Sequence, residues 1–218
     1  MTLTERLSSL RDRAMQTARG QAAWRQVMER LVASQAETGA LDVGDQIPDF
    51  LLPNSDGRLV SSPELLARGP LVISFFRGGW CPWCRATLEA FQGALPEIEA
   101  AGANLVALIA DTRGQLVEMR DGLGLSFDLL CDVDHGVALR FGVLFRLPSL
   151  YREGLAANHV DLVERQGIDG WFVPIPATYI VDPGGIIRWR YLNIDYTQRP
   201  EPDAMIAPIR ALVPVLPR

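Results

Sequence analysis

The sequence predicts an α/β fold in which helices flank a central mixed β-sheet and an N-terminal helical extension precedes that sheet. Short apolar runs of strand length alternate with helical segments through the middle of the chain, which is typical of a sheet covered by helices. Two later apolar runs are joined by Asp-Pro-Gly-Gly at residues 182–185, a turn signal that makes them neighbouring strands. The first 38 residues instead repeat apolar side chains at helical spacing.

Size and composition limit the function classes. A chain of 218 residues with 48% apolar content predicts one core-forming domain, residues 41–218, and a helical appendage, residues 1–40. A net charge of −5 without any basic block argues against nucleic-acid binding. No apolar run approaches the roughly 20 residues of a membrane span, and no apolar leader follows the charged N-terminus. We therefore expect a cytoplasmic protein that does not enter a membrane.

The cysteine and lysine counts restrict the chemistry further. Three cysteines are too few for a disulfide-stapled scaffold, and a close pair in a reducing compartment is more typical of catalysis or metal binding. All 21 basic residues are arginine. The absence of lysine excludes Schiff-base chemistry and a Walker-type phosphate site.

The N-terminal extension carries its own helix signals. Thr2 and Glu5 form a capping-box pattern. Two apolar sets at helical spacing then follow, on either side of Gly20: Leu3, Leu7, Leu10 and Ala14, then Trp24, Val27, Met28 and Leu31. Such a stripe can pack on the chain's own domain or pair with a second copy in a homodimer.

Strands and helices are expected to alternate through the domain, with turn-forming residues such as glycine and proline marking their ends. The expected elements are a hairpin at 49–52 and 58–60, a short helix from Pro63 capped by Ser62, a strand at 71–76, a helix from the cysteines to about residue 100, a strand at 105–110, a helix at 113–121, a strand at 127–130, a helix at 136–141, strands at 177–181 and 186–192, and a helix at 204–213. Residues 143–175 interrupt this rhythm. We expect them to form an insertion that covers one edge of the domain near the site.

One stretch carries the candidate chemistry. The apolar strand 71–76 is followed by two glycines and then by Cys81-Pro82-Trp83-Cys84, which opens a helix. Proline suits the first helical position because its missing N–H would be unpaired there. Both sulfurs then lie at a helix start, where free N–H groups and the helix dipole favour a thiolate. This layout suits dithiol redox chemistry.

These residues resemble a known family. Trp-Cys-Pro-Trp-Cys at 80–84 is similar to the thioredoxin signature, and the body resembles the peroxiredoxin-like alkyl hydroperoxide reductase and thiol-specific antioxidant (AhpC/TSA) family. The segments that carry this resemblance are 43–52 with Asp56-Gly57, 129–132, 136–138, 141–143 and 179–188. The resemblance covers residues 43–213 and implies a thioredoxin-like fold.

The sequence departs from the family at its peroxide-binding positions. The family's Pro-x-x-x-Thr/Ser-x-x-Cys motif, aligned on Cys84, places Arg77 at the proline and Cys81 at the threonine. The position of the family's later arginine is Pro176. The resemblance to thioredoxin implies that Pro176 is a cis-proline facing the dithiol, and Phe75 replaces thioredoxin's buried carboxylate.

Cys81 and Cys84 are the predicted catalytic pair. The first thiol of such a motif is usually exposed, so we expect Cys81 to attack and Cys84 to close an intramolecular disulfide. The peroxiredoxin alignment reverses these roles. Two other interpretations stay open: a pair of inert buried cysteines, or a zinc site that adds Cys131 and His135. Cys131 is otherwise expected in the core and His135 at the surface or in a cap.

Several neighbours are predicted to bind substrate. Arg77 and Arg85 flank the dithiol, where a guanidinium lowers a thiol pKa and guides an anionic or peptide substrate, although Arg85 also fits a solvated helix position. Trp80 is expected mainly to pack, whereas Trp83 is expected to be exposed and to contact a partner together with Pro176. The sequence suggests no chemical role for the polar cluster at 195–199.

The sequence thus predicts a thiol-based antioxidant oxidoreductase. Its dithiol at Cys81 and Cys84 would reduce peroxides or disulfides without an organic cofactor or a metal. An external thiol, such as a thioredoxin or glutathione system, would restore it. The alternatives are a general disulfide reductase without useful peroxidase activity, or a zinc-stabilised or redox-inert interaction module.

Overall fold

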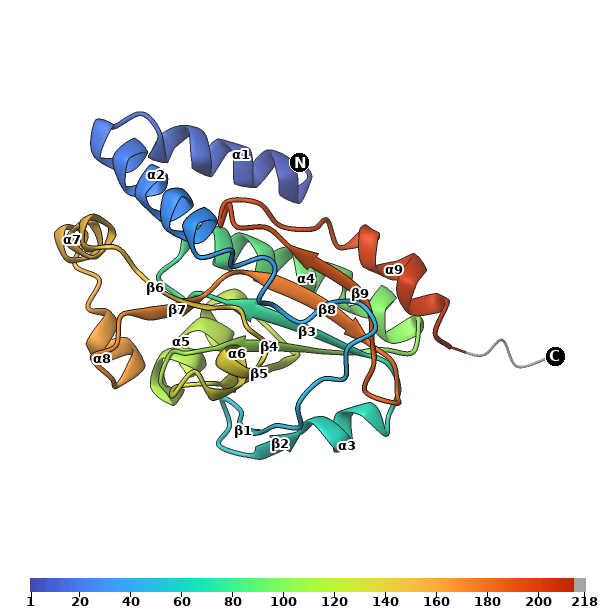
Figure 1. The fold of residues 1–218 in the computed structure, drawn as a ribbon. Coiled ribbons are helices and arrows are strands. Elements are labelled where there is room, and N and C mark those ends of the chain that lie inside the picture. Colours follow the sequence, from blue (N-terminus) through green and yellow to red (C-terminus); the bar gives the residue numbers. More distant parts are fainter. Residues whose placement is uncertain (214–218) are drawn as a thin grey trace.

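A five-stranded mixed sheet forms the centre of the computed structural model, which describes residues 1–213 (Figure 1). The strand order is β5-β4-β3-β8-β9. The strands are β3 (Leu71–Phe76), β4 (Asn104–Ile109), β5 (Asp128–Cys131), β8 (Ala177–Val181) and β9 (Ile187–Leu192). The first three are parallel, whereas β8 runs antiparallel to β3, and β9 antiparallel to β8. The predicted α/β fold with a central mixed sheet is confirmed.

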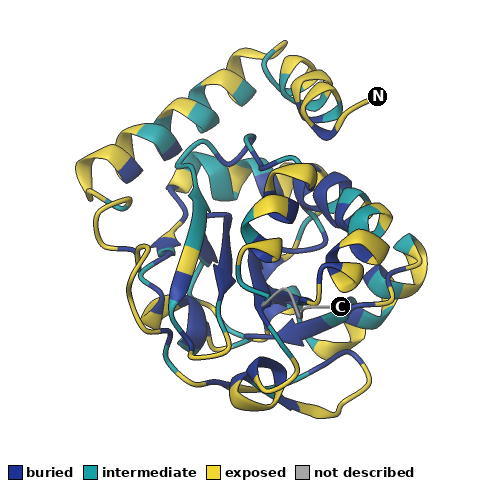
Figure 2. Ribbon diagram, turned by 90° about the vertical axis from the view of Figure 1, so that its right-hand side faces the viewer, coloured by how far each residue is buried: buried dark blue, intermediate teal, exposed yellow. Residues whose placement is uncertain are grey.

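Strand β3 occupies the middle of this sheet and is buried along its whole length (Figure 2). Its Ile73 lies between Val106 of β4 and Tyr179 of β8. A strand with covered neighbours on both edges and both faces is mainly apolar, which explains why residues 71–76 show no alternation. Its one polar side chain, Ser74, forms a hydrogen bond with the Thr178 hydroxyl of β8 at 2.8 Å. The chain therefore leaves the centre of the core directly into the cysteine turn.

Helices cover the sheet and place the cysteines at the carboxyl end of β3. They are α3 (Ser62–Leu66), α4 (Pro82–Ala100), α5 (Arg113–Leu123), α6 (Gly136–Arg140) and α9 (Asp203–Arg210). The long helix α4 packs against β4 and α9, and α9 packs against β8. Among the described residues, no helix combines the length and apolarity that crossing a bilayer requires.

A small hairpin, β1 (Leu51–Pro53) with β2 (Leu59–Ser61), precedes α3. The cap predicted at Ser62 is wrong. Ser61 is the N-cap, and its hydroxyl accepts a hydrogen bond from the Glu64 amide. The Ser62 hydroxyl instead accepts from the Phe50 amide and so ties the helix to the hairpin's approach. Two adjacent serines offer the same local signal, and the tertiary contact to Phe50 separates them.

The N-terminal extension consists of α1 (Leu3–Ala14) and α2 (Ala18–Ala33) (Figure 1). The predicted capping box of Thr2 and Glu5 is present. The helical stretch ends earlier than residue 38, because Gln35 adopts a left-handed φ of 51°. Helix α1 packs on α4, and α2 packs on α7, so the apolar stripe is covered by the chain itself.

The insertion predicted at 143–175 holds four elements: β6 (Leu144–Arg146), α7 (Ser149–Ala157), α8 (Leu162–Gln166) and β7 (Phe172–Pro174). Strands β6 and β7 pair antiparallel and bring the ends of the insertion together. The helices α7 and α8 then reach the cysteine turn from outside the sheet, and each of them contributes a side chain to that turn.

Candidate active site

The site begins where β3 ends at Phe76 and α4 begins at Pro82. Gly78 has a φ of +139°, and a Cβ atom there would lie 2.3 Å from the Trp80 indole nitrogen, so only glycine fits. The Cys81 amide donates to the Gly78 carbonyl at 3.1 Å. Cys81 is thus the N-cap of α4, with Pro82 at its first helical position, as the sequence predicts.

A partly buried ion pair fixes the same turn from its other side. The Gly79 amide donates to a carboxylate oxygen of Asp111 at 2.7 Å, and Arg165 of α8 bonds that oxygen at 3.1 Å. Asp111 is fully buried, so burial raises the pKa of its carboxyl although Arg165 and Gly79 oppose that rise. The pair positions the turn and connects it to the insertion.

The two sulfurs differ in acidity. Burial by itself raises the pKa of the Cys81 thiol, but a hydrogen bond from Cys84 and the charges of Arg77 and Arg199 lower that pKa to about 6. Burial and the hydrogen bond that the Cys84 thiol donates to Cys81 hold the pKa of Cys84 well above its ordinary value. Both residues are free cysteines and fully buried. The exposure expected for Cys81 is therefore wrong, because residues outside the motif cover the helix start.

Arg77 supplies the positive charge beside the thiols in an unusual way. Its guanidinium is fully buried and lies over three aromatic rings, with its Cζ 4.9 Å from the centroid of Trp80, 4.8 Å from that of Tyr151 and 4.2 Å from that of Tyr196. None of its nitrogens has a hydrogen-bond partner among the described residues. Burial by itself lowers the pKa of Arg77, but Tyr151 and Cys81, which can become anionic, raise it overall. We call Arg77 with these three rings the arginine cage.

Arg199 is a functional candidate that sequence reasoning missed. It is buried in the loop after β9, and its guanidinium donates to the Cys84 sulfur at 3.7 Å and to the Tyr196 carbonyl. Tyr196 from the same loop completes the arginine cage. The polar cluster at 195–199 was visible in the sequence, but no motif connects it to cysteines more than 100 positions earlier.

A cavity of about 580 Å³ lies beside the start of α4, although neither cysteine is among its lining residues. The two residues between the cysteines, Pro82 and Trp83, form part of its wall. Its other lining residues come from the α1–α2 junction, from α7 and from the arginine cage: Arg13, Ala14, Thr17, Arg19, Gly20, Ala23, Trp80, Tyr151, Gly154, Leu155, Asn158, Val160 and Tyr196. The extension and the insertion thus build most of the wall of this cavity.

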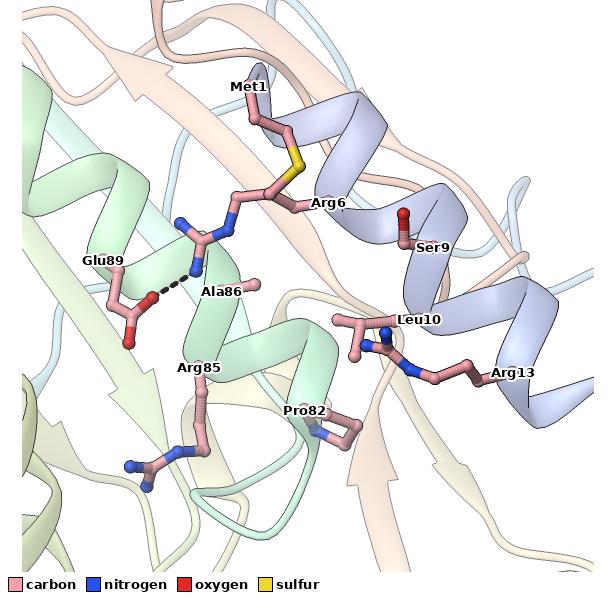
Figure 3. A pocket seen from close by; sticks show the side chains of 9 residues that line it. All are labelled: Met1, Arg6, Ser9, Leu10, Arg13, Pro82, Arg85, Ala86 and Glu89. Atoms are coloured by element: carbon pink, nitrogen blue, oxygen red, sulfur yellow. Dashed lines mark hydrogen bonds and ion pairs between the residues drawn. The ribbon is translucent and has the colours of Figure 1, made fainter.

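A second cavity of about 450 Å³ lies between α1 and α4 (Figure 3). Arg6 and Glu89 form an ion pair across it, and Arg85 extends from α4 away from α1. Pro82 and Arg13 line both cavities, so the two lie on either side of the α4 start. Arg85 is half-buried on this helix and is absent from the charges that lower the pKa of Cys81, which fits its solvated interpretation.

The aromatic and proline predictions need two corrections. Trp83 is only 6% exposed and packs edge-on against Tyr196 at 5.5 Å, because the loop after β9 folds over it. Trp80 is partly exposed and packs on Tyr151, in agreement with its packing role. No cis peptide bond occurs in residues 1–213, so the bond before Pro176 is trans. Pro176 is buried just before β8, which pairs with β3.

The zinc alternative does not match the side-chain positions. In residues 1–213, no three His, Cys, Asp or Glu side chains gather closely enough to hold a metal ion. Cys131 ends β5 in the core, as expected, and its thiol donates to the Asp111 carbonyl at 3.1 Å. His135 is the N-cap residue of α6, one of its two expected places, although its side chain forms no capping hydrogen bond; it is buried, and burial lowers its pKa. It packs against Phe172 of the insertion.

A mixed sheet of this topology with a vicinal dithiol at a strand-to-helix turn defines a thiol-dependent oxidoreductase of thioredoxin-like fold. The AhpC/TSA family model matches residues 43–190, so the chain belongs to the AhpC/TSA family. Rv2521 of Mycobacterium tuberculosis strain H37Rv, whose name places it among the peroxiredoxins, is 33% identical over 161 residues, covering 74% of this chain and 91% of that protein. Membership makes the protein an enzyme of the peroxiredoxin type.

Solved structures share the fold. The peroxidoxin BcpB from Mycobacterium tuberculosis superposes with a TM-score of 0.62 at 21% identity, covering 80% of this chain and 99% of that one. The yeast mitochondrial 1-Cys peroxiredoxin superposes with a TM-score of 0.59 at 16% identity, covering 79% of this chain and 76% of that one. The thiol-resolving mechanism of that yeast protein operates via glutathione and thioredoxin systems.

Proposed function

We propose that Cys81 and Cys84 perform the redox chemistry, with Cys81 as the attacking thiolate. One observation carries this assignment. The fully buried Arg77 lacks any fixed anionic partner among the described residues, and Cys81 is the acidic group beside it. A buried charge needs compensation, and a thiolate on Cys81 provides it.

The reaction then follows in two balanced steps. The Cys81 thiolate attacks the terminal oxygen of a hydroperoxide, the O–O bond breaks, and the alkoxide or hydroxide leaves and takes up a proton. Cys81 becomes a sulfenic acid. Cys84 attacks that sulfur, forms the disulfide and releases water. Arg199 donates to the Cys84 sulfur and favours its thiolate in this second step. Two electrons pass from the sulfur pair to the peroxide.

An external thiol must return these electrons, and a thioredoxin or glutathione system is the proposed source. A reducing compartment, the cytoplasm, keeps such a system available. Pairing of two copies into a homodimer stays a prediction, which sedimentation equilibrium of the purified protein tests.

A general disulfide reductase is the second candidate. Arg77, Cys81 and Pro176 stand where the resembled peroxiredoxin pattern has its proline, threonine and later arginine. The protein thus lacks that peroxide-binding set while it keeps a dithiol. In this case the Cys81 thiolate attacks a disulfide sulfur instead of a peroxide oxygen.

One experiment tests the assignment and ranks both candidates. Reduced protein is mixed with one equivalent of hydrogen peroxide, of an alkyl hydroperoxide or of a peptide disulfide. Mass spectrometry then follows the loss of two hydrogens and identifies the joined sulfurs. We expect a Cys81–Cys84 disulfide, with Cys81→Ser inert. Cys84→Ser should stop at a Cys81 sulfenic acid with either peroxide and at a Cys81–peptide mixed disulfide with the peptide disulfide. A Cys81 thiol that stays unmodified under every oxidant overturns the proposal.

A further inference from the structure

The cavity beside the start of α4 is the strongest feature that the redox assignment leaves unused. Its volume of about 580 Å³ falls within the range of small-molecule sites. Its wall includes Pro82 and Trp83, between the cysteines, and two exposed arginines near the junction of α1 and α2, Arg13 and Arg19. We propose that this cavity binds a low-molecular-weight anionic thiol, which reduces the Cys81–Cys84 disulfide. The inference rests on the proposed dithiol cycle.

The charges around the cavity favour an anion. Arg13 and Arg19 are exposed, and neither forms an ion pair among the described residues. None of the described residues that line the cavity is acidic. Apolar and aromatic side chains such as Trp80, Tyr151 and Leu155 form the interior. Two cations at the rim of a low-dielectric cleft raise the local concentration of small anions.

The arginine cage adds a charge that responds to oxidation. Arg77 lies behind Trp80, Tyr151 and Tyr196, all three of which also line the cavity. In the reduced protein, the Cys81 thiolate balances its charge. A disulfide carries no charge, so oxidation leaves the buried guanidinium without its anion. The oxidised site therefore attracts an incoming thiolate more strongly than the reduced site does.

The size of the reductant follows from burial. Both sulfurs are fully buried, and neither cysteine lines the cavity, whose wall includes residues of α2 and α7, two helices that pack together. A protein dithiol must bring its own sulfur to within bonding distance, which requires these helices to separate. A small thiol fits the existing space against Pro82 and Trp83, so only this part of the wall must move for the thiol to reach a sulfur. The extension, which lies outside the matched family region of residues 43–190, thus selects the reductant.

The reduction balances with two thiols. A first thiolate bonds to the Cys84 sulfur and breaks the Cys81–Cys84 bond, and the electron pair remains on Cys81. Cys81 is the better leaving group because Arg77 and Arg199 stabilise its thiolate. A second thiolate then bonds to the ligand sulfur of the mixed disulfide. It releases the external disulfide and Cys84, which takes up a proton.

A charge series of thiols tests this site. The protein disulfide is prepared with diamide, which needs no peroxide step. Its reduction is followed by mass spectrometry with 2-mercaptoethanesulfonate, 2-mercaptoethanol and cysteamine, with rates expressed per thiolate concentration. We expect the anionic probe to react fastest, by about tenfold over the neutral one, and the order to flatten at high salt.

Matched variants assign the effect to the rim. Arg13→Gln with Arg19→Gln should slow the anionic probe about tenfold and change the neutral probe less than about twofold. Arg68→Gln removes an exposed charge beyond α3, on the far side from α2 in Figure 1, and should change neither rate.

Three results distinguish a failure of the anionic-thiol site from a failure of the proposed dithiol function. Rates independent of probe charge, or unchanged in the double variant, overturn the anionic-thiol site. A thioredoxin-type protein dithiol that reduces the protein faster than every small thiol also overturns it. A protein that forms no disulfide with diamide overturns the proposed function instead.

Discussion

Two arginine sites flank the same glycine turn, and they differ in what balances their charge. Arg165 contacts Asp111 at 3.1 Å, and that carboxylate also holds the Gly79 amide. Arg77, on the other side of Gly78, has three aromatic rings and no carboxylate. The first charge has a permanent counterion, whereas the second depends on the protonation state of Cys81.

Because of this difference, one arginine site stabilises the turn and the other affects the reactivity of the thiol. In the first pair, Asp111 and Arg165 neutralise each other, although Asp111 Oδ1 and Arg165 Nε have no hydrogen-bond partner among the described residues. Such a pair holds its geometry but leaves neither charge free to act elsewhere. Rings compensate a cation only in part, so the remaining field acts on the nearest titratable group. The turn thus keeps its shape through Asp111 and its reactivity through Arg77. Variants that remove one of these charges at a time separate the two effects.

The largest expected effect is on stability. Asp111→Ala removes the counterion of Arg165 and the acceptor of the Gly79 amide, so the free energy of unfolding should fall by about 3 kcal/mol. The pKa of Cys81 should stay near 6 in the folded variant, because Arg77 and Arg199 remain. Urea unfolding and the pH dependence of iodoacetamide alkylation measure the two quantities. A loss below about 1 kcal/mol would make the pair dispensable.

Arg77→Met should produce the opposite pattern. It removes a charge that lowers the pKa of Cys81, so that pKa should rise by about one to two units, and alkylation at pH 6.5 should slow by about tenfold or more. The free energy of unfolding should change by less than about 1 kcal/mol, since methionine removes both the contacts of the guanidinium with the rings and the cost of burying its charge. The control, Arg85→Met, removes a surface charge from α4. Equal effects of the two variants would contradict the special role of the cage.

The pH dependence gives a smaller and graded effect. Only the Cys81 thiolate reacts, so the rate of oxidation should level above pH 7 and fall about tenfold per pH unit below about 6. Cys84→Ala removes the hydrogen bond to the thiolate and should move this midpoint upward by about one unit. Stopped-flow oxidation across roughly pH 4.5–9 measures both midpoints. A midpoint near 8.5 would show that the cage has no effect on the thiol.

The smallest effect concerns the turn backbone. Gly79→Ala places a Cβ atom 3.1 Å from the Met119 sulfur and 3.1 Å from an Arg165 guanidinium nitrogen, so we expect a loss of about 1 kcal/mol in unfolding free energy. Gly93→Ala in α4 meets nothing within 4 Å and should instead add about 0.5–1 kcal/mol. Thermal unfolding of both variants compares them. A neutral Gly79→Ala would mean that the Asp111 side of the turn relaxes easily.

Local signals allowed much of this architecture to be predicted. The strands at 71–76 and 177–181 agree with the sequence residue for residue, since each is an apolar run that fills one strand of a covered sheet. The capping box at Thr2 and the proline at the start of α4 were also predictable from the sequence. These features depend on neighbours within a few positions, and such neighbours are present in the sequence itself.

The sequence by itself determined the sheet, the helix that carries the dithiol and the identity of the two sulfurs. Only the tertiary structure decided that both sulfurs and Trp83 are buried, that Arg199 reaches Cys84, and that Arg77 is enclosed by rings. The physical reason is distance along the chain. Tyr151 and Tyr196 join the site from the insertion and from the loop after β9, and no periodicity or spacing within one segment encodes where two remote segments meet.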